Sequence, residues 1–249
     1  MKAGLGSSTS FAVCLAACFV HWKCLQRGNA HYQFNEEELK RISNYANRCE
    51  EVVQLYMPEM DARVCTYGQI CRYRYNIKRR NKDILLKVPK MKILLIDSGI
   101  RLNKYQQLEI MAQKRYSHPT NVDNILVRIN QISKTAIRNL AALYKFITKR
   151  NVFLHKLQEI HEILSINIQL NQKWLCELGL SHPNLNKICT IAKTNKLPGK
   201  LTGFGGYAYI LLPPDVSLEF VAFISEQILE AGFTVTMTTV SCNGVRIDY

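Results

Sequence analysis

Hydrophobic residues recur at helical spacing over most of this chain. Residues 8–22 predict one apolar helix, and Asn35 followed by Glu38 predicts a second, capped helix that ends near Val53. A longer apolar stripe predicts a helix over 122–150. Its members are Ile125, Ile129, Ile132, Ala136, Leu140, Leu143 and Ile147. A stripe of this kind indicates a helix with one face in a hydrophobic core.

The rest of the pattern predicts further helices and several strands. The helices are expected over 104–116, 152–176, 184–195 and 216–231, and the strands over 93–96, 207–212, 233–237 and 244–248. Residues 55–75 are expected to form loop and strand, and 87–92, with a proline, to form a linker. This order predicts an α+β fold class with two domains, one over 1–90 and one over 91–249.

Composition places the chain among globular proteins. Of 249 residues 47% are hydrophobic, which is enough for a sizeable core. The nine cysteines, an odd number, lie mostly in apolar periodic segments and predict buried, reduced thiols in the cytosol. No apolar run is expected to reach the roughly 20 residues of a membrane span, and the first helix lacks a signal-peptide cleavage site. The protein is therefore expected to be soluble and cytoplasmic, without a membrane partner.

The net charge of +14 is high, and much of it lies in residues 72–92. There Arg72, Tyr73, Arg74 and Tyr75 alternate, a pattern that could bind nucleic acid through phosphate contacts and base stacking. An exposed hairpin whose field attracts an anionic nucleotide would have the same pattern. No recognised nucleic-acid module accompanies these residues, so the hairpin is the preferred interpretation.

A glycine- and serine-rich segment precedes the first helix. It reads Gly4, Leu5, Gly6, Ser7 and Ser8. Glycines allow a phosphate to approach the backbone, the helix N-terminus offers amide donors, and serine hydroxyls can bind phosphate or Mg²⁺. The segment is not a P-loop, because no Gly-Lys-Ser/Thr follows. Alone, it could equally be an ordinary turn and helix cap.

A second glycine-rich segment follows Lys200 and leads into a strand. It contains Gly203, Gly205 and Gly206. Together the two segments resemble motifs two and three of the GHMP kinases, the superfamily of galacto-, homoserine, mevalonate and phosphomevalonate kinases. Within it the resemblance is to the mevalonate kinase family. Further matching positions are Asn44-Tyr45-Ala46, Glu50, Asp61, Thr66-Tyr67-Gly68, Ile93-Leu94-Leu95 and Leu178-Gly179-Leu180-Ser181-His182.

The resemblance implies a fold and a reaction. The fold would be a two-domain GHMP kinase fold with a ferredoxin-like C-terminal domain. The reaction would be ATP- and Mg²⁺-dependent phosphorylation of the primary alcohol of mevalonate. It implies Asp61 as the base, and Ser8 and Glu50 as metal ligands. The ATP phosphates would be held by Gly4, Leu5, Gly6, Ser7, Ser8, Gly203, Gly205 and Gly206. The family also suggests a homodimer.

Each of the three predicted metal-binding and catalytic positions also has a structural explanation from the residues alone. Ser8 could simply cap its helix, Glu50 could form a surface pair with Arg48, and Asp61 could lie in an ordinary turn. The joint register of the three positions favours the kinase interpretation.

Several positions depart from the family. Around the base the family has His-Gly-x-Pro-Ser-Gly-x-Asp-Asn, of which residues 54–62 keep only Asp61, and Phe204 and Tyr207 stand where the third motif has small residues. The family's first strands, first motif and a lysine would lie upstream of Lys2, so the first domain is expected to be an incomplete remnant. A catalytically dead kinase that serves as a binding or dimerisation module, and a related substrate such as phosphomevalonate, are the alternatives.

Overall fold

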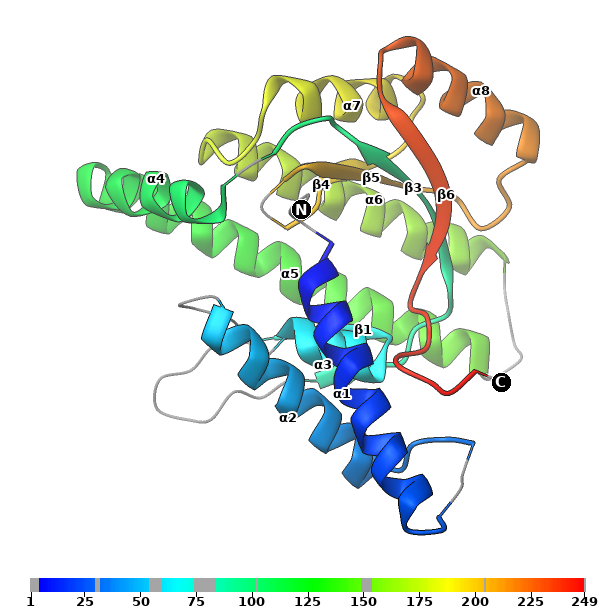
Figure 1. Ribbon diagram of the computed structural model, residues 1–249. Helices are drawn as coiled ribbons and strands as arrows, with labels where there is room; N and C mark the ends of the chain where they lie inside the picture. The colour runs from blue at the N-terminus through cyan, green and yellow to red at the C-terminus, as the bar shows by residue number, and fades with distance from the viewer. Residues whose placement is uncertain are drawn as a thin grey trace. The chain divides into compact units, whose positions relative to one another are not determined.

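The structure, a computed structural model, describes residues 5–29, 32–53, 60–73, 84–101, 103–148, 154–203 and 205–248. The chain forms two compact units (Figure 1). The C-terminal unit contains Pro89–Val240, and the N-terminal unit contains Gly6–Val88 and Ser241–Tyr249. The sequence had grouped 241–249 with the C-terminal domain. The tail joins the other unit because the Val245 amide donates to the carbonyls of Cys65 and Thr66, at 3.1 Å each.

The C-terminal unit is built on one antiparallel sheet. Its strands are β3 (Met91–Asp97), β4 (Gly199–Leu201), β5 (Tyr207–Leu211) and β6 (Thr234–Val240). They lie in the order β4-β5-β3-β6, so the first strand of the unit lies between the third and the fourth. This is the ferredoxin-like order that the resemblance implies.

The described part of the C-terminal unit also contains five helices. They are α4 (Lys104–Ser117), α5 (Pro119–Thr148), α6 (Leu154–Glu177), α7 (Pro183–Thr194) and α8 (Leu218–Glu230). Alternate strand residues such as Leu94 and Ile210 point to one face of the sheet, where they meet Ile188 of α7 and Ile224 of α8. All four side chains are fully buried. The long helices α5 and α6 pack on each other, and α6 also contacts β4.

The N-terminal unit is mainly helical. It contains α1 (Ser7–Gln26), α2 (Glu36–Val53), α3 (Met60–Tyr67) and the short antiparallel pair β1 (Ile70–Arg72) and β2 (Ile84–Leu86). The three helices share a core of small and branched side chains. These are Val13, Ala16, Ala17, Val20, Ile42, Ala46 and Ala62. The predicted cap of α2 is confirmed, because the Glu38 amide donates to Asn35 Oδ1 at 3.0 Å and the Asn35 amide to Glu38 Oε2 at 2.9 Å.

Three sequence predictions are wrong. Residues 60–67 form a helix rather than loop and strand, with Ala62 and Thr66 buried at i, i+4 spacing. Residues 244–248 form no strand, since the tail pairs only through an isolated bridge between Gly68 and Asn243. The nine cysteines are free, as predicted, but none is fully buried and five are exposed.

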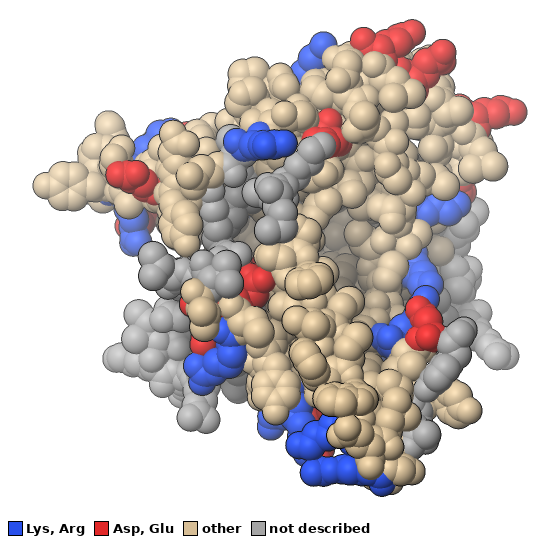
Figure 2. Space-filling model, in the orientation of Figure 1, with Lys and Arg blue, Asp and Glu red and all other residues tan. Residues whose placement is uncertain are grey.

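The first helix, α1, is longer and more apolar than expected, since the sequence predicted no segment long enough to span a membrane. Among the described residues it is the one helix that meets the criteria of length and apolar composition. Core helices of globular proteins meet the same criteria, and one face of α1 lies in the helical core. Its other face exposes Phe11, Phe19 and Trp22, and in Figure 2 uncharged side chains run along this helix.

The burial of α8 generates a stability prediction. Ile228 is fully buried in the core of the C-terminal unit, so Ile228→Ala is expected to lower the free energy of unfolding by about 2–5 kcal/mol. The next residue, Leu229, is 56% exposed, and Leu229→Ala is expected to change it by no more than about 0.5 kcal/mol. Urea denaturation followed by circular dichroism measures both variants. Equal losses would contradict the assigned face of α8.

Candidate active site

The N-terminus of α1 is shaped to receive an anion. Gly6 is the N-cap residue and adopts the left-handed conformation, with φ +65°. Its carbonyl accepts hydrogen bonds from the Ser10 amide at 2.8 Å and the Ser10 hydroxyl at 3.0 Å. Glycine has no side chain to cap the first amides of the helix, and the first turn holds no acidic residue. Those amides and the positive end of the helix dipole are suited to a phosphate.

Some of the phosphate-loop residues predicted from the sequence lie at the start of α1. Gly6, Ser7 and Ser8 form the cap and the first residues of α1, and Leu5 precedes them with its side chain exposed. Gly4 lies outside the described residues. The described part of the predicted loop therefore lies at the N-terminus of α1, and its phosphate-binding role stays a prediction.

The structure brings Ser8 and Glu50 together. The Ser8 hydroxyl donates to Glu50 Oε2 at 3.4 Å, across the interface between α1 and α2. Glu50 is only 4% exposed, and a buried carboxylate is costly unless it is compensated. Arg48, considered above as a surface partner, forms its ion pair with Glu51 at 2.8 Å. The two side chains are thus in contact, and their shared role as metal ligands stays a prediction.

This pair of oxygens fits a magnesium ion. Mg²⁺ binds six oxygens octahedrally at about 2.1 Å, so neighbouring ligand oxygens lie roughly 3.0 Å apart. The Ser8–Glu50 separation is close to that value. Among the described residues no three His, Cys, Asp or Glu side chains gather as a metal cage. One carboxylate and one hydroxyl suit Mg²⁺, which usually keeps waters and substrate phosphates as its other ligands.

Asp61 lies in the first turn of α3, one turn before Cys65. The Cys65 sulfur lies 3.3 Å from the Ser10 hydroxyl of α1. Burial raises the pKa of the Cys65 thiol, and the carboxylates of Asp61 and Glu50 raise it further, while the bond from Ser10 opposes them. Both predicted carboxylates therefore act on one thiol beside the first turns of α1. The N-terminal unit gathers all three predicted side chains in one region.

The second glycine-rich segment is the tight connection between β4 and β5. The Thr202 amide donates to the Tyr207 carbonyl at 2.9 Å, and the Gly205 amide to the Thr202 carbonyl at 2.6 Å. Gly205 and Gly206 have φ of +94° and +89°, which other residues adopt only with strain. Gly203 also has a positive φ, of +44°, and Phe204 lies outside the described residues. The loop therefore requires its glycines for the backbone path itself.

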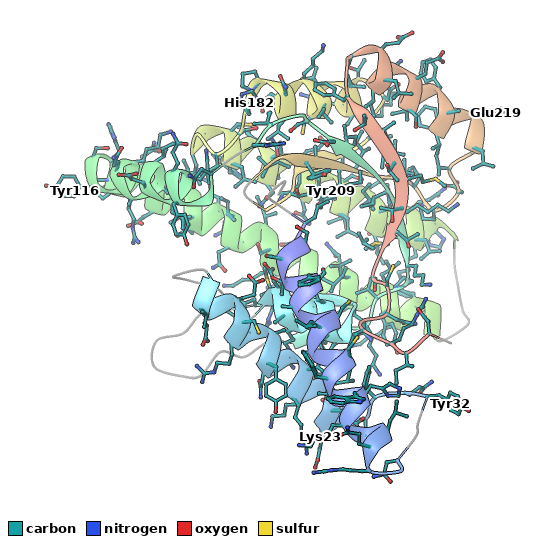
Figure 3. The ribbon with its side chains drawn as sticks, in the orientation of Figure 1. Lys23, Tyr32, Tyr116, His182, Tyr209 and Glu219 are labelled. Carbon is teal, nitrogen blue, oxygen red and sulfur yellow. The ribbon has the colours of Figure 1, made fainter. Side chains whose placement is uncertain are left out.

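The sequence analysis missed Ser98, which anchors this loop. Ser98 is 1% exposed, and its hydroxyl and amide donate to the Gly206 carbonyl at 2.7 and 3.0 Å. The Ser98 carbonyl in turn accepts from the Asn184 side chain at 3.0 Å. Asn184 follows His182, which caps the start of α7 (Figure 3). A hydroxyl directly after the buried strand β3 was the available signal.

Lys200, at the start of the same motif, lies in a poorly solvated position of β4. It is paired in register with Tyr209 of β5, which Figure 3 labels. Burial lowers the pKa of Lys200 to about 8, although the nearby Cys189 acts in the opposite direction. Burial also raises the pKa of Tyr209 to about 12. Burial therefore disfavours the charged form of the Lys200 amine.

Comparison with known proteins relates the chain to one group of kinases. It is 29% identical over 253 residues to the mevalonate kinase of Bos taurus, 27% over 252 residues to that of Homo sapiens and 25% over 251 residues to that of Arabidopsis thaliana. These matches cover 98%, 98% and 99% of this chain and 60%, 60% and 62% of the relatives. The chain thus spans about 60% of their length. No protein-family model matches it.

Solved structures agree on the fold. The structure of L. major mevalonate kinase in complex with R-mevalonate matches with a TM-score of 0.72 at 16% identity, over 96% of this chain and 67% of that one. Lactococcus lactis galactokinase complexed with galactose matches with a TM-score of 0.57 at 12% identity, over 99% of this chain and 69% of that one. At such identities the likeness establishes the GHMP kinase fold.

The clustering around Cys65 can be tested by its reactivity. Asp61→Asn and Glu50→Gln each remove a negative charge that raises the pKa of this thiol. Each variant is expected to speed the alkylation of Cys65 by iodoacetamide at pH 8 by about two- to threefold. Mass spectrometry of the Cys65 peptide gives the rate, and the exposed Cys176 is the internal reference. Unchanged rates in both variants would contradict the clustering.

Proposed function

We propose, from the premise that this chain is a divergent relative of the mevalonate kinases within the GHMP superfamily, that it phosphorylates the primary alcohol of mevalonate with ATP. The observation that carries the proposal is the Ser8–Glu50 contact at the N-terminus of α1. It puts a hydroxyl and a buried carboxylate beside amides suited to phosphate.

The proposed binding roles come from the resemblance to the GHMP kinases, and the geometry of the described elements is used in their support. The first amides of α1, from Gly6 to Ser8, would hold phosphate oxygens of ATP, as would Gly4 and Leu5. Ser8 and Glu50 would hold Mg²⁺, which when bound neutralises charge on the phosphates. The loop residues Gly203, Gly205 and Gly206 are proposed to lie around the ATP phosphates. The Gly205 amide already donates to the Thr202 carbonyl, so the proposed donors in this loop are the amides of Gly203 and Gly206. Ser98 would position that loop through Gly206.

Asp61 is proposed as the base. In the transfer, the mevalonate hydroxyl oxygen forms a bond to the γ-phosphorus, the bond from that phosphorus to the bridging oxygen of ADP breaks, and Asp61 takes the hydroxyl proton. A carboxylate suffices for this role, because the proton leaves as the new bond forms. Phosphoryl transfer depends mainly on positioning and charge neutralisation, which backbone amides and a Mg²⁺ ion held by Ser8 and Glu50 would supply.

The cellular setting is proposed on the same grounds. Nine free cysteines, five of them exposed, suit a reducing compartment such as the cytosol. The resemblance also suggests a homodimer, which sedimentation of the purified protein would test.

Turnover provides the direct test. The protein is expected to release ADP from MgATP only when mevalonate is present, and Asp61→Asn is expected to slow this release by about 10²–10⁴-fold. A coupled assay of ADP formation measures both. Asp215→Asn, at an exposed site outside the proposed machinery, should leave the rate unchanged. A chain without mevalonate-dependent ADP release, or full activity in Asp61→Asn, would overturn the proposal or the assignment of the base.

The metal assignment makes a separate prediction. Glu50→Gln keeps the shape of the side chain but removes its charge, so the Mg²⁺ concentration for half-maximal rate is expected to rise by at least about tenfold. Titration of the ADP-release rate with MgCl₂ at fixed ATP measures this change. The matched control is Glu51→Gln, at the next position, where the exposed carboxylate is paired with Arg48. An unchanged Mg²⁺ requirement in Glu50→Gln would remove Glu50 from the metal site.

A further inference from the structure

A separate cavity lies inside the C-terminal unit, between the α5–α6 pair and the sheet. Its volume is about 180 Å³. The lining is mainly apolar, and the buried contributors are Leu143 of α5, Ile160 and Leu164 of α6, and Leu211 and Leu212. Lys90 and Lys92 also line it, and both residues are exposed. An apolar cavity of about 150 Å³ is known to admit benzene, so this one has room for a single ring or a short chain.

One polar side chain interrupts the apolar lining. His161, on α6, lines the cavity, and its Nε2 atom is buried without a hydrogen-bond partner among the described residues. The other ring nitrogen, Nδ1, lies 3.5 Å from the Ser165 hydroxyl, which donates to the His161 carbonyl at 2.8 Å. The Leu212 backbone acts on the ring as a nearby hydrogen-bonding group that raises its pKa, while Nε2 has no hydrogen bond of standard geometry among the described residues.

The imidazole is held in its neutral form. Burial lowers the pKa of His161, and it outweighs the Leu212 backbone and the carboxylates of Asp215 and Glu162, which act in the opposite direction. A neutral ring with one bonded nitrogen has one free position that can accept or donate a hydrogen bond.

Water satisfies this position poorly. An ordered buried water needs two to four polar partners, whereas the lining is mainly hydrocarbon and its ionisable side chains are His161 and the exposed Lys90 and Lys92. A buried polar atom without a partner is unfavourable, and so is an empty apolar cavity. A molecule with a hydrocarbon body and one hydroxyl relieves both conditions at once.

We propose that this cavity binds a small uncharged apolar alcohol or phenol, whose hydroxyl pairs with His161 Nε2 and whose hydrocarbon body contacts Leu143 and Leu164. The site is distinct from the glycine-rich loops and does not depend on phosphoryl transfer. Its ligand is limited by volume to about six to eight non-hydrogen atoms.

Phenol and toluene form a matched pair of probes, because a methyl group in toluene replaces the hydroxyl. Isothermal titration of the whole protein is expected to give a Kd for phenol on the order of 0.1–1 mM. His161→Leu should weaken phenol binding by about tenfold and leave toluene within twofold. Leu164→Phe, which fills the cavity, should abolish binding of both. His155→Leu, an exposed histidine on the same helix, is the control and should change neither.

The outcomes separate the parts of the proposal. Equal phenol affinity in wild type and His161→Leu would remove the histidine anchor, and phenol binding that persists in Leu164→Phe would remove the cavity. Absence of phenol binding to the wild-type protein would overturn the whole proposal. If a variant fails to fold by circular dichroism, ¹⁵N spectra of the wild type decide. Phenol must then shift the Nε2 resonance of His161 and be displaced by excess toluene.

Discussion

The close packing of α1 against α2 is the constraint on which the N-terminal unit depends. Alanines at positions 16, 17 and 46 form this contact, and small side chains allow two helices to approach closely. Only at this separation does the Ser8 hydroxyl reach the Glu50 carboxylate. A larger side chain at Ala16 or Ala46 would therefore disturb the candidate metal site without touching either ligand. The core and the chemistry share one interface.

In the C-terminal unit, backbone conformation and hydrogen bonds position the glycine-rich loop between β4 and β5. There the path of the glycine-rich segment is set by positive φ angles at Gly205 and Gly206, and its end is held by Ser98. Ser98 directly follows β3. This strand pairs with β5 over five residues and with β6 over seven, so the sheet fixes its position. The loop is thus held at its strand ends by hydrogen bonds, and between them its path requires glycine.

Features that depend on neighbouring residues could be predicted from the sequence. The cap formed by Asn35 and Glu38 and the long helices α5 and α6 are local patterns, and both agree with the structure. The pairing of Ser8 with Glu50 was reached only through the family resemblance, because 42 residues separate them. Ser98 was missed because its partner lies 108 residues away and is a backbone carbonyl, which carries no sequence signal.

The two predicted carboxylates differ in what their positions cost. Asp61 lies in the first turn of α3, where a negative charge is stabilised by the helix dipole, so its presence has a purely structural explanation. Glu50 lies in the last turn of α2, where the dipole opposes a negative charge, and it is buried as well. The Ser8 hydroxyl and the positive end of α1 offset part of this cost. Glu50 therefore occupies the less favourable of the two positions, and its contact with Ser8 is the geometry on which the proposed Mg²⁺ role rests.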